Sequence, residues 1–277
     1  MSIKSIAVAT DFSARADRAI DRAKILRDQF GAQLHLIHAT NLADDDPPDM
    51  ADMDRRMCAA SGLSSDEKGV EFAFPSGSPP KAIAKACANC DADVLALGPA
   101  RYNTIGDFFL GTAVDHILRN ADLPVLVVKS RAHAPYDRII AGTDYSDASA
   151  HAIIRAARMF PDAKVHIVHA WEVAFQAFNK DAHVAGQTQD DEQRQMKDFL
   201  AKLREKEPRL AEATFQLVRG NTISALREAL QKDPNALVVL GSHGESGFKQ
   251  ATIGSVTSEL LRYLEGDTLV INTKDAE

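Results

Sequence analysis

The sequence has few cysteines and no long apolar run. Only three of its 277 residues are cysteine, which is far below the density of a secreted disulfide scaffold. No stretch approaches the roughly eighteen apolar residues that a membrane-spanning helix needs. The N-terminus has only a short apolar stretch before Thr10 and Asp11, which does not match a signal peptide. We therefore expect a cytoplasmic protein without a membrane segment.

An excess of positive charge is also missing. The formal net charge is -7, whereas a nucleic-acid-binding face needs clustered lysine and arginine. No G-x-G-x-x-G follows the first apolar segment of either half, and no G-x4-G-K-[ST] is present. These absences argue against a dinucleotide dehydrogenase and a P-loop ATPase. The Ser-Gly-Gly-x-Asp-Ser loop of ATP pyrophosphatases is absent as well.

The chain repeats itself once. Three segments of the first half return in the second half in the same order, and the second copy gains about a dozen residues between its second and third repeated segments. The paired segments are 6–13 (IAVATDFS) with 139–146 (IIAGTDYS), 34–39 (LHLIHA) with 165–170 (VHIVHA), and 77–98 with 220–241. A repeat this long indicates two duplicated domains and not a solenoid.

Each copy alternates short apolar segments with helical patterns. In the first copy we expect strands near 3–10, 33–40, 69–75, 93–98 and 123–129, and helices near 14–30, 50–61, 79–90 and 111–121. Strands that are apolar on both faces are typical of a parallel sheet covered by helices. The pattern predicts an α/β fold with two doubly wound parallel five-stranded sheets. Ser13 is the candidate N-cap of the first helix, with Asp17 in its first turn.

The boundary between the copies is expected in the segment SRAHAPYD, at 130–137. We place the first domain at 1–132 and the second at 137–277. The last strand of each domain, Leu123–Lys129 and Thr268–Thr273, would otherwise leave an apolar sheet edge exposed. We expect these two strands to pair within the chain and to create a pseudo-twofold dimer of domains. Further dimerisation of whole chains stays open.

A candidate ligand site lies in the second copy, where the carboxyl ends of parallel strands form the usual binding edge. Three features converge there: Asp144 after the first strand, the loop Gly241-Ser-His-Gly244, and the helix start Gly254-Ser255. The glycines let backbone N–H groups approach phosphate, and the helix N-terminus adds its positive dipole end. The hydroxyls of Ser255 and Thr257 can also donate to phosphate. Each element alone also fits an ordinary turn or helix start, and their combination favours the site.

The spacing G-x2-G-x9-G-[ST] in this copy resembles the ATP-binding signature of the universal stress protein family, and Thr143-Asp144 resembles its first-strand motif. The resemblance covers essentially the whole chain, twice. It implies a Rossmann-like fold of the adenine nucleotide alpha hydrolase type, with ATP, accompanied by Mg²⁺, as ligand. It also implies that Asp144 and the main chains of Ala170 and Leu240 hold adenine and ribose. The residues that it assigns to the phosphates are Gly241, Gly244, Gly254, Ser255, Val256 and Thr257.

The first copy departs from this signature. It retains Asp11, Gly98 and the pair Gly111-Thr112, but Arg101 replaces the second glycine and Pro99 removes a backbone N–H. Arg101 either blocks the pocket or binds phosphate through its guanidinium. We favour a weak or absent nucleotide site in this copy.

The sequence predicts a regulatory protein more than an enzyme. No obvious general base accompanies the predicted phosphate site, and we assign no catalytic residue and no metal-ligand set. Slow ATP hydrolysis and a nucleotide-independent partner-binding scaffold stay as alternatives, with the protein partner unknown. The pair Cys87 and Cys90 is interpreted as helix packing, because the C-terminal end of a helix raises the pKa of a thiol.

Overall fold

The computed structural model joins both halves of the chain in one sheet. It describes residues 2–40, 49–99, 101–104, 107–109, 111–120, 122–171, 182–242 and 253–272. The first half contributes β1 (Ser5–Ala9), β2 (Gln33–Ile37), β3 (Val70–Ala73), β4 (Val94–Leu97) and β7 (Val125–Val127). The second half contributes β8 (Arg138–Gly142), β9 (Lys164–Trp171), β10 (Thr214–Arg219), β11 (Leu237–Gly241) and β12 (Thr268–Ile271).

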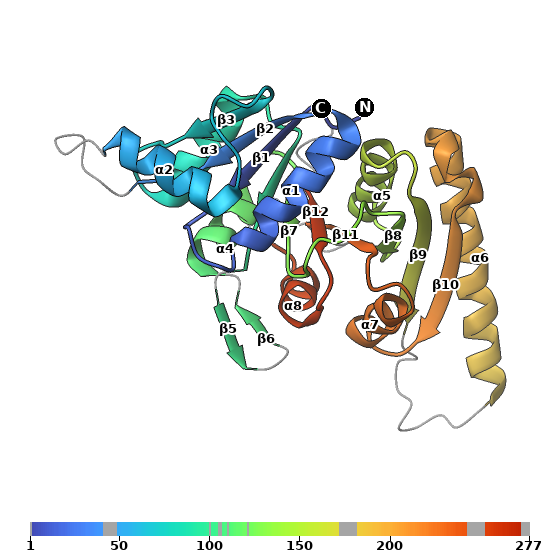
Figure 1. Cartoon of the computed structure of the whole chain (residues 1–277). Coiled ribbons are helices and arrows are strands. Elements are labelled where there is room, and N and C mark those ends of the chain that lie inside the picture. Colours follow the sequence, from blue (N-terminus) through green and yellow to red (C-terminus); the bar gives the residue numbers. More distant parts are fainter. Residues whose placement is uncertain are drawn as a thin grey trace.

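The order of the ten strands is β10-β9-β8-β11-β12-β7-β4-β1-β2-β3. Within each half the strands are parallel, and the order reverses next to the first strand of the half, as in a doubly wound fold. The halves meet where β12 pairs with β7 in antiparallel fashion, with Leu269 opposite Leu126. This confirms the expected pairing of the last strands and the pseudo-twofold arrangement (Figure 1).

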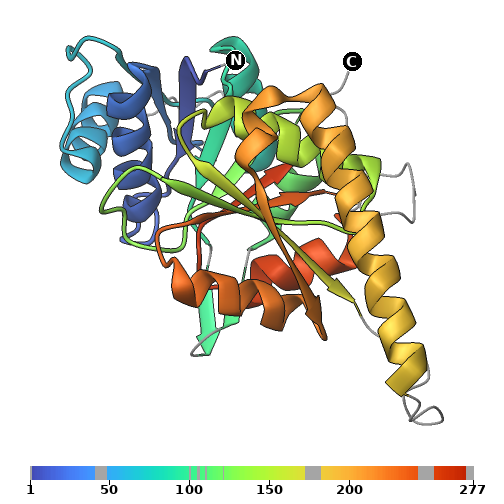
Figure 2. The ribbon, with the colours of Figure 1, turned by 90° about the vertical axis from the view of Figure 1, so that its right-hand side faces the viewer.

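Helices cover both faces of this sheet. The helices are α1 (Asp17–Phe30), α2 (Met50–Ser61), α3 (Pro79–Asn89), α4 (Gly111–Asn120), α5 (Asp147–Met159), α6 (Ala182–Lys206), α7 (Thr222–Lys232) and α8 (Ser255–Tyr263), with a 3-10 turn η1 (Pro208–Glu212). Side chains of α1, α2, α5 and α6 share one apolar core that runs across both halves. Those of α3 and α4, and of α7 and α8, fill cores on the opposite face. The long α6 lies along the β10 edge (Figure 2).

The strands of the first half alternate their side chains between these cores. Ile6 and Val8 of β1 belong to the core under α1, whereas Ala7 and Ala9 belong to the core under α3 and α4. All four are buried, as expected for a strand covered on both faces. The predicted strands and helices of this half are confirmed, with ends that differ by a few residues.

The start of α1 corrects one prediction. Ser13 is not its N-cap, since the helix begins at Asp17 after Ala16, which supplies no side-chain cap. The N–H of Ser13 instead donates to Asp11 Oδ1 at 3.0 Å, and the N–H of Ala16 donates to Ser13 O at 2.8 Å. An extra turn thus separates Ser13 from the helix. The position of Asp17 in the first turn is confirmed.

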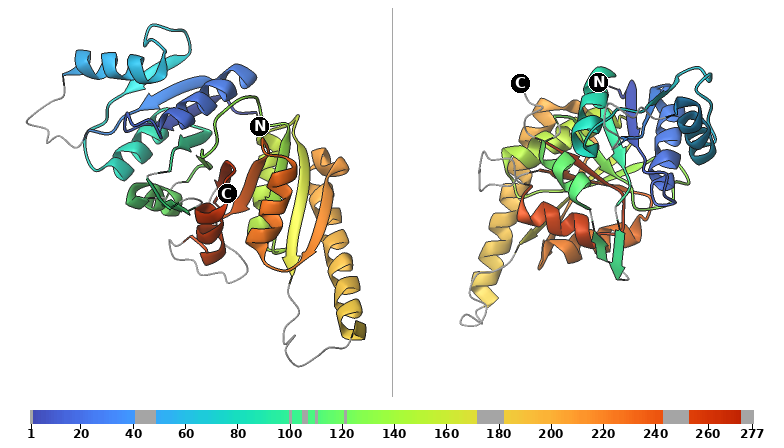
Figure 3. Two further views of the ribbon diagram at one scale, coloured as in Figure 1. Left: turned by 60° about the horizontal axis from the view of Figure 1, so that its bottom comes forward. Right: turned by 90° about the vertical axis from the view of Figure 1, so that its left-hand side faces the viewer.

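A short antiparallel hairpin was not predicted. It consists of β5 (Arg101–Thr104) and β6 (Asp107–Phe109), and it occupies the segment that corresponds to the glycine loop of the second half. The hairpin extends away from the main sheet, and β6 lies against α8 of the other half (Figures 1 and 3). The corresponding residues of the second half, 244–252, lie outside the described residues.

Candidate functional site

A tight turn places Asp144 at the carboxyl end of β8. The N–H of Tyr145 donates to Thr143 Oγ1 at 3.0 Å, and Tyr145 adopts a left-handed conformation with φ of 65°. The N–H of Ser146 donates to Asp144 Oδ1 at 3.1 Å, and Ser146 is the N-cap of α5. The turn is thus held by side-chain acceptors on both sides, and Asp144 stays exposed.

The same turn recurs in the first half. The N–H of Phe12 donates to Thr10 Oγ1 at 3.0 Å, and Phe12 has a φ of 59°. The N–H of Ser13 donates to Asp11 Oδ1. The repeated Thr-Asp-aromatic-Ser segment therefore encodes one backbone geometry, which presents an exposed carboxylate at the same place in both halves.

A histidine from the neighbouring strand supports each turn. His169 donates from Nδ1 to the carbonyl of Thr143 at 2.7 Å, since a carbonyl oxygen can only accept, and its ring lies 4.1 Å from the Tyr145 ring. His38 makes the matching bond to Thr10 O at 2.9 Å and stacks on Phe12 at 4.1 Å. These contacts fix the tautomer and the ring plane of both histidines.

The two histidine sites differ in their outer partner. In the second half, Glu192 of α6 accepts from the Tyr145 hydroxyl at 3.2 Å and lies 3.3 Å from Nε2 of His169. Burial, followed by the charge of Glu192, raises the pKa of the Tyr145 hydroxyl. In the first half the Arg56 guanidinium lies over the Phe12 ring, 4.5 Å from its centroid. The electrostatic surroundings of the equivalent turns are therefore opposite in sign.

The N-terminus of α8 faces the same edge as Asp144. Gly254 is its N-cap and supplies no side-chain bond, whereas α5 and α7 are capped by Ser146 and Asn221. The N–H of Gly254 donates to Ser242 O at 2.9 Å. The first N–H groups of α8 are thus left without a side-chain cap, which is the arrangement that suits an anion.

Thr257 joins this helix to the end of β11. Its hydroxyl donates to the carbonyl of Gly241 at 2.9 Å, so in this structure it positions the glycine backbone. The hydroxyl hydrogen that we expected to meet phosphate is therefore directed at the protein. The residue is nearly buried, at 7% exposure, whereas neighbouring Val256 is 53% exposed.

The structure brings the predicted site residues of the second half together around one cavity of about 290 Å³. The predicted residues that line it are Thr143, Asp144, Ala170, Leu240, Gly241, Gly254, Ser255, Val256 and Thr257. Gly244 lies outside the described residues. Other lining residues were not predicted from the sequence, namely Gly142, Ser149, His169, Thr222 and Leu260. Of these, Gly142, His169 and Thr222 belonged to repeated segments, which was the available signal.

In the first half, Asp11 and Gly98 line an equivalent cavity. A Cβ added at Gly98 would lie 2.9 Å from the carbonyl oxygen of Arg15, so the glycine is required by the close packing of the turn that precedes α1. Gly111 and Thr112 open α4, and Arg101 opens β5; the structure does not describe their side chains. That Arg101 either blocks or binds phosphate stays a prediction.

The cysteine pair shows no sign of a reactive or metal site. Cys87 is 2% exposed in the core under α3, and burial raises the pKa of its thiol to about 12. Cys90 Sγ donates to the carbonyl of Cys87 at 3.5 Å. Over the described ranges, no group of three His, Cys, Asp or Glu side chains could hold a metal ion.

In that same part of the chain, no helix is both long enough and apolar enough to span a bilayer.

Comparison with known proteins connects this architecture to one family. The sequence model of the universal stress protein family matches residues 2–129 and again residues 135–272. A universal stress protein of Thermus aquaticus, described as lying in the 3' region of a QAH/OAS sulfhydrylase, is 27% identical over 135 residues. That alignment covers 46% of this chain and 98% of the Thermus protein, so the relative corresponds to a single half.

Solved structures match the whole chain. A universal stress protein from Archaeoglobus fulgidus DSM 4304 has a TM-score of 0.67 and 17% identity, and the match covers 97% of this chain and 98% of that one. A functionally unknown protein from Pseudomonas aeruginosa PAO1 has a TM-score of 0.67 and 19% identity, with coverage of 99% and 94%. At this identity the likeness shows that the fold, with both halves in one chain, is shared.

Proposed function

The chain belongs to the universal stress protein family, and we propose that its second half binds ATP, accompanied by Mg²⁺, as a regulatory ligand. The observation that carries this proposal is the convergence of three features on one cavity. These are the exposed carboxylate of Asp144, the glycine edge at Gly241 and the uncapped start of α8 at Gly254. The carboxylate suits the sugar or the base of a nucleotide, and the other two features suit its phosphates.

Within this proposal, Asp144 accepts from a ribose hydroxyl or from the exocyclic amine of adenine. The main chains of Ala170 and Leu240, which line the same cavity, contact the base and the sugar. The phosphates lie toward Gly241, Gly254 and the first turn of α8, and Gly244 is expected to complete this edge. Thr257 acts indirectly, because its bond to the Gly241 carbonyl holds the glycine backbone in place.

We propose that turnover is slow or absent. Asp144 and His169 are the titratable side chains among the described residues of the cavity lining. His169 is held through Nδ1 by the Thr143 carbonyl and faces Glu192 with its other nitrogen, so it supports the turn. Activation of a water molecule requires a base within hydrogen-bond reach of it. A steady-state ATPase rate on the order of 10 per second would contradict this part of the proposal.

Calorimetric titration with ATP tests the binding site. Asp144→Ala should weaken binding about tenfold or more, because a hydrogen bond to a charged group contributes about 1.5–3 kcal/mol. Asp11→Ala is the matched control, since it removes the equivalent carboxylate of the first half and should leave ATP binding unchanged. Equal affinity of the Asp144→Ala variant and the unaltered chain would overturn the assignment.

The stoichiometry of the same titration tests the asymmetry of the two halves. We expect close to one ATP per chain, because Arg101 and Pro99 interrupt the glycine signature of the first half. Gly244→Asp should abolish binding, since it introduces a negative charge beside phosphate. Two equivalent ATP molecules per chain, with one lost in Arg101→Gly, would show that Arg101 is a phosphate ligand.

A further inference from the structure

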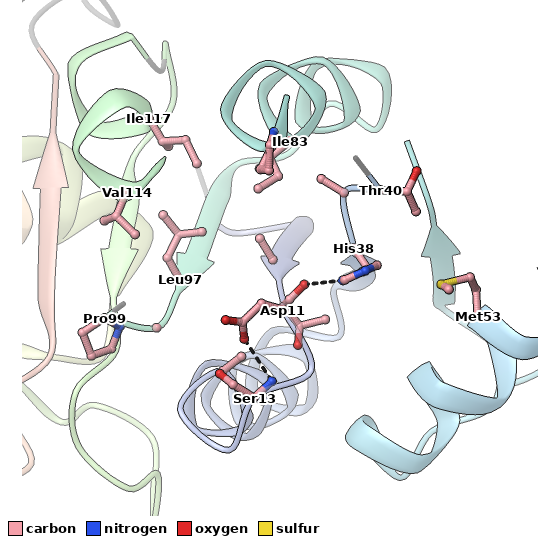
Figure 4. A pocket seen from close by; sticks show the side chains of 16 residues that line it. Asp11, Ser13, His38, Thr40, Met53, Ile83, Leu97, Pro99, Val114 and Ile117 are labelled. Carbon is pink, nitrogen blue, oxygen red and sulfur yellow. Dashed lines mark hydrogen bonds between the residues drawn. The ribbon is translucent and has the colours of Figure 1, made fainter. Parts of the chain in front are cut away.

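The first half contains a cavity of about 460 Å³ at the same edge of the sheet as the ATP site of the second half. It lies at the carboxyl ends of β1 and β4, among α1, α2, α3 and α4. Figure 4 shows Leu97, Val114 and Ile117 on one side of it, opposite Thr40 and Met53. The cavity is thus open to a ligand although the phosphate signature of this half is interrupted.

Two hydroxyls of the second-half site have no equivalent here. Thr257, which holds the Gly241 carbonyl, corresponds to Val114 in α4. Ser149, whose hydroxyl shares a hydrogen bond of 2.8 Å with Thr143, corresponds to Ala16 before α1. The replacements keep a similar side-chain volume at Val114 and remove polar atoms at both positions. Each one makes the wall of the cavity more apolar.

Two prolines also replace polar residues of the second-half site. Pro79, at the start of α3, stands where the second half has Thr222, and Pro99, after β4, stands where it has Ser242. In the second half the N–H of Ser242 donates to the Ile271 carbonyl. A proline has no N–H, so Pro79 removes a backbone donor at the start of α3, whereas the N–H that Pro99 lacks is one that the second half uses within its sheet.

A phosphate group would find no lysine or arginine partner among the described side chains of this cavity. Asp11 places an exposed carboxylate at its edge, held by the N–H of Ser13. The second cavity has the same charge at Asp144, so what disfavours phosphate in the first one is its more apolar wall, where an unpaired charge loses its hydration.

The polar groups of the cavity are gathered near Asp11. Ser13 Oγ is shielded from solvent and finds no hydrogen-bond partner among the described residues. His38 is oriented by its bond to the Thr10 carbonyl and stacks on Phe12. A buried hydroxyl without a partner costs about 1–3 kcal/mol, so a polar atom of a ligand beside Ser13 would be stabilised.

We propose that the first half binds a second, different ligand: a phosphate-free small molecule, uncharged or cationic. Its body is apolar and of the size of a two- or three-ring aromatic, and it lies against Leu97, Val114 and Ile117. One N–H or O–H group of this ligand donates to Asp11. The proposal does not depend on ATP binding by the second half, since it concerns a separate cavity.

Two fluorescent probes that differ by one sulfonate test this selectivity. N-phenyl-1-naphthylamine is neutral and carries one N–H donor, whereas 8-anilino-1-naphthalenesulfonate has the same rings and a negative charge. In titrations of the full-length chain we expect the first half to bind the neutral probe at least about tenfold more tightly, a difference of about 1.4 kcal/mol. Equal or tighter binding of the sulfonated probe in the first half would overturn the proposal.

Matched variants locate the binding. Val114→Phe fills the first cavity and should abolish binding of the neutral probe, whereas Thr257→Phe makes the equivalent change in the second half and should leave it unchanged. Asp11→Asn should weaken binding of the neutral probe several-fold. It should also reduce the ratio between the affinities for the neutral and the sulfonated probe. Neutral-probe binding that survives in Val114→Phe but is lost in Thr257→Phe would place it in the other cavity and contradict the proposal.

A milder variant keeps the test decisive if Val114→Phe fails to fold. Val114→Thr installs the side chain that the second half already holds at this position, so it is expected to fold, as thermal unfolding would verify. The variant should weaken binding of the neutral probe several-fold, because a hydroxyl replaces a methyl group in the apolar wall. Unchanged affinity for the neutral probe in this folded variant would count against the assigned site.

Discussion

At the scale of single residues, the molecule holds two aromatic side chains in an unfavourable backbone conformation. Phe12 and Tyr145 have φ values of 59° and 65°, which bulky L-residues rarely adopt. Such outliers cost on the order of 1–3 kcal/mol and tend to occur at ligand sites. Here the conformation is held by a threonine acceptor and by the histidine ring against each aromatic. Its result is that Asp11 and Asp144 project from the sheet edge.

Thr143→Val tests whether this strained turn depends on the threonine oxygen. The variant keeps the shape of the side chain but removes the acceptor of the Tyr145 N–H and the partner of the Ser149 hydroxyl. We expect a loss of about 1–3 kcal/mol of stability in urea denaturation, the cost of a buried donor without a partner. ATP affinity should fall as well, since Asp144 loses its fixed position.

The control for this variant is Thr10→Val in the first half. It removes the matching acceptor of the Phe12 N–H and should destabilise the protein to a similar extent. ATP affinity should be unaffected, because the ATP site is assigned to the second half. A Thr143→Val variant that unfolds at the same urea concentration as the unaltered protein would show that the turn holds without the threonine oxygen.

At the scale of elements, the sequence predicted the regular structure of the first half and the pairing of its last strand. Runs such as Ile6-Ala-Val-Ala9 can only be buried on both faces, so strand positions followed from apolar content alone. Capping was less predictable. Ser13 and Ser146 occupy the same place in nearly identical segments, but only Ser146 caps its helix. The difference lies in where the next helix begins, which is set by packing and not by the motif.

The candidate site was predictable to the extent that its residues carry backbone constraints. Each of these residues alone also fits an ordinary turn or helix start, and it was their combination at one sheet edge that made Gly241, Gly254 and Asp144 stand out. His169 did not, because its role depends on contacts across the sheet to the Thr143 carbonyl and the Tyr145 ring. The β5–β6 hairpin was missed for a related reason, since pairing between two short segments is not encoded in either one alone.

The junction of α5 with η1 gives a pH-dependent prediction. Glu207 is nearly buried, with 5% of its side chain exposed, and it accepts from Arg158 Nε at 2.6 Å and from the Arg209 N–H at 3.3 Å. The hydrogen bond from Arg158 holds the pKa of the Glu207 carboxyl below its usual value of about 4.5. Because the folded state binds the proton less tightly, the carboxylate stabilises the fold above pH 4.5. That contribution is lost as the pH falls below this value.

Glu207→Gln should therefore lower the free energy of unfolding by about 1 kcal/mol at pH 7. This is the net contribution of a typical hydrogen bond, here with a partly exposed partner. The difference in stability from the unaltered protein should shrink as the pH falls below about 4.5. Urea denaturation at several pH values measures it. A stability difference that stays constant over this range would show that the charge of Glu207 has no part in holding the junction.

At the scale of the whole molecule, a buried polar cluster joins the halves beside the β7–β12 pairing. Asp267 accepts from the N–H of Lys129 at 2.8 Å, from the Tyr136 hydroxyl at 2.6 Å and from Arg22 Nε at 3.2 Å. Arg22 also lies over the Tyr136 ring, 4.0 Å from its centroid. Burial lowers the pKa of the Lys129 amine to about 7, and its Nζ donates to carbonyls at the end of α8.

This cluster breaks the symmetry of the duplication. Asp267 precedes β12, and the equivalent residue before β7 is Pro124. One acid thus receives donors from α1, from the segment that follows β7 and from the connection between the halves. Apolar side chains on both sides of the junction share a core, as Val127 of β7 and Val270 of β12 do. A shared core would hold the halves in several registers, whereas a single buried acid with fixed donors favours one.

Asp267→Asn tests this role. The variant leaves Arg22 buried without a charged partner. We therefore expect the free energy of unfolding, measured by urea denaturation, to fall by about 3–5 kcal/mol. Adding Arg22→Met should recover part of the loss, because the uncompensated charge is then removed. Glu228→Gln, which breaks an exposed pair with Lys232, is the control and should change stability by less than about 0.5 kcal/mol. If the double variant were less stable than Asp267→Asn alone, Arg22 would be stabilising the fold through its packing on Tyr136, and the buried charge pair would not be what fixes the register of the halves.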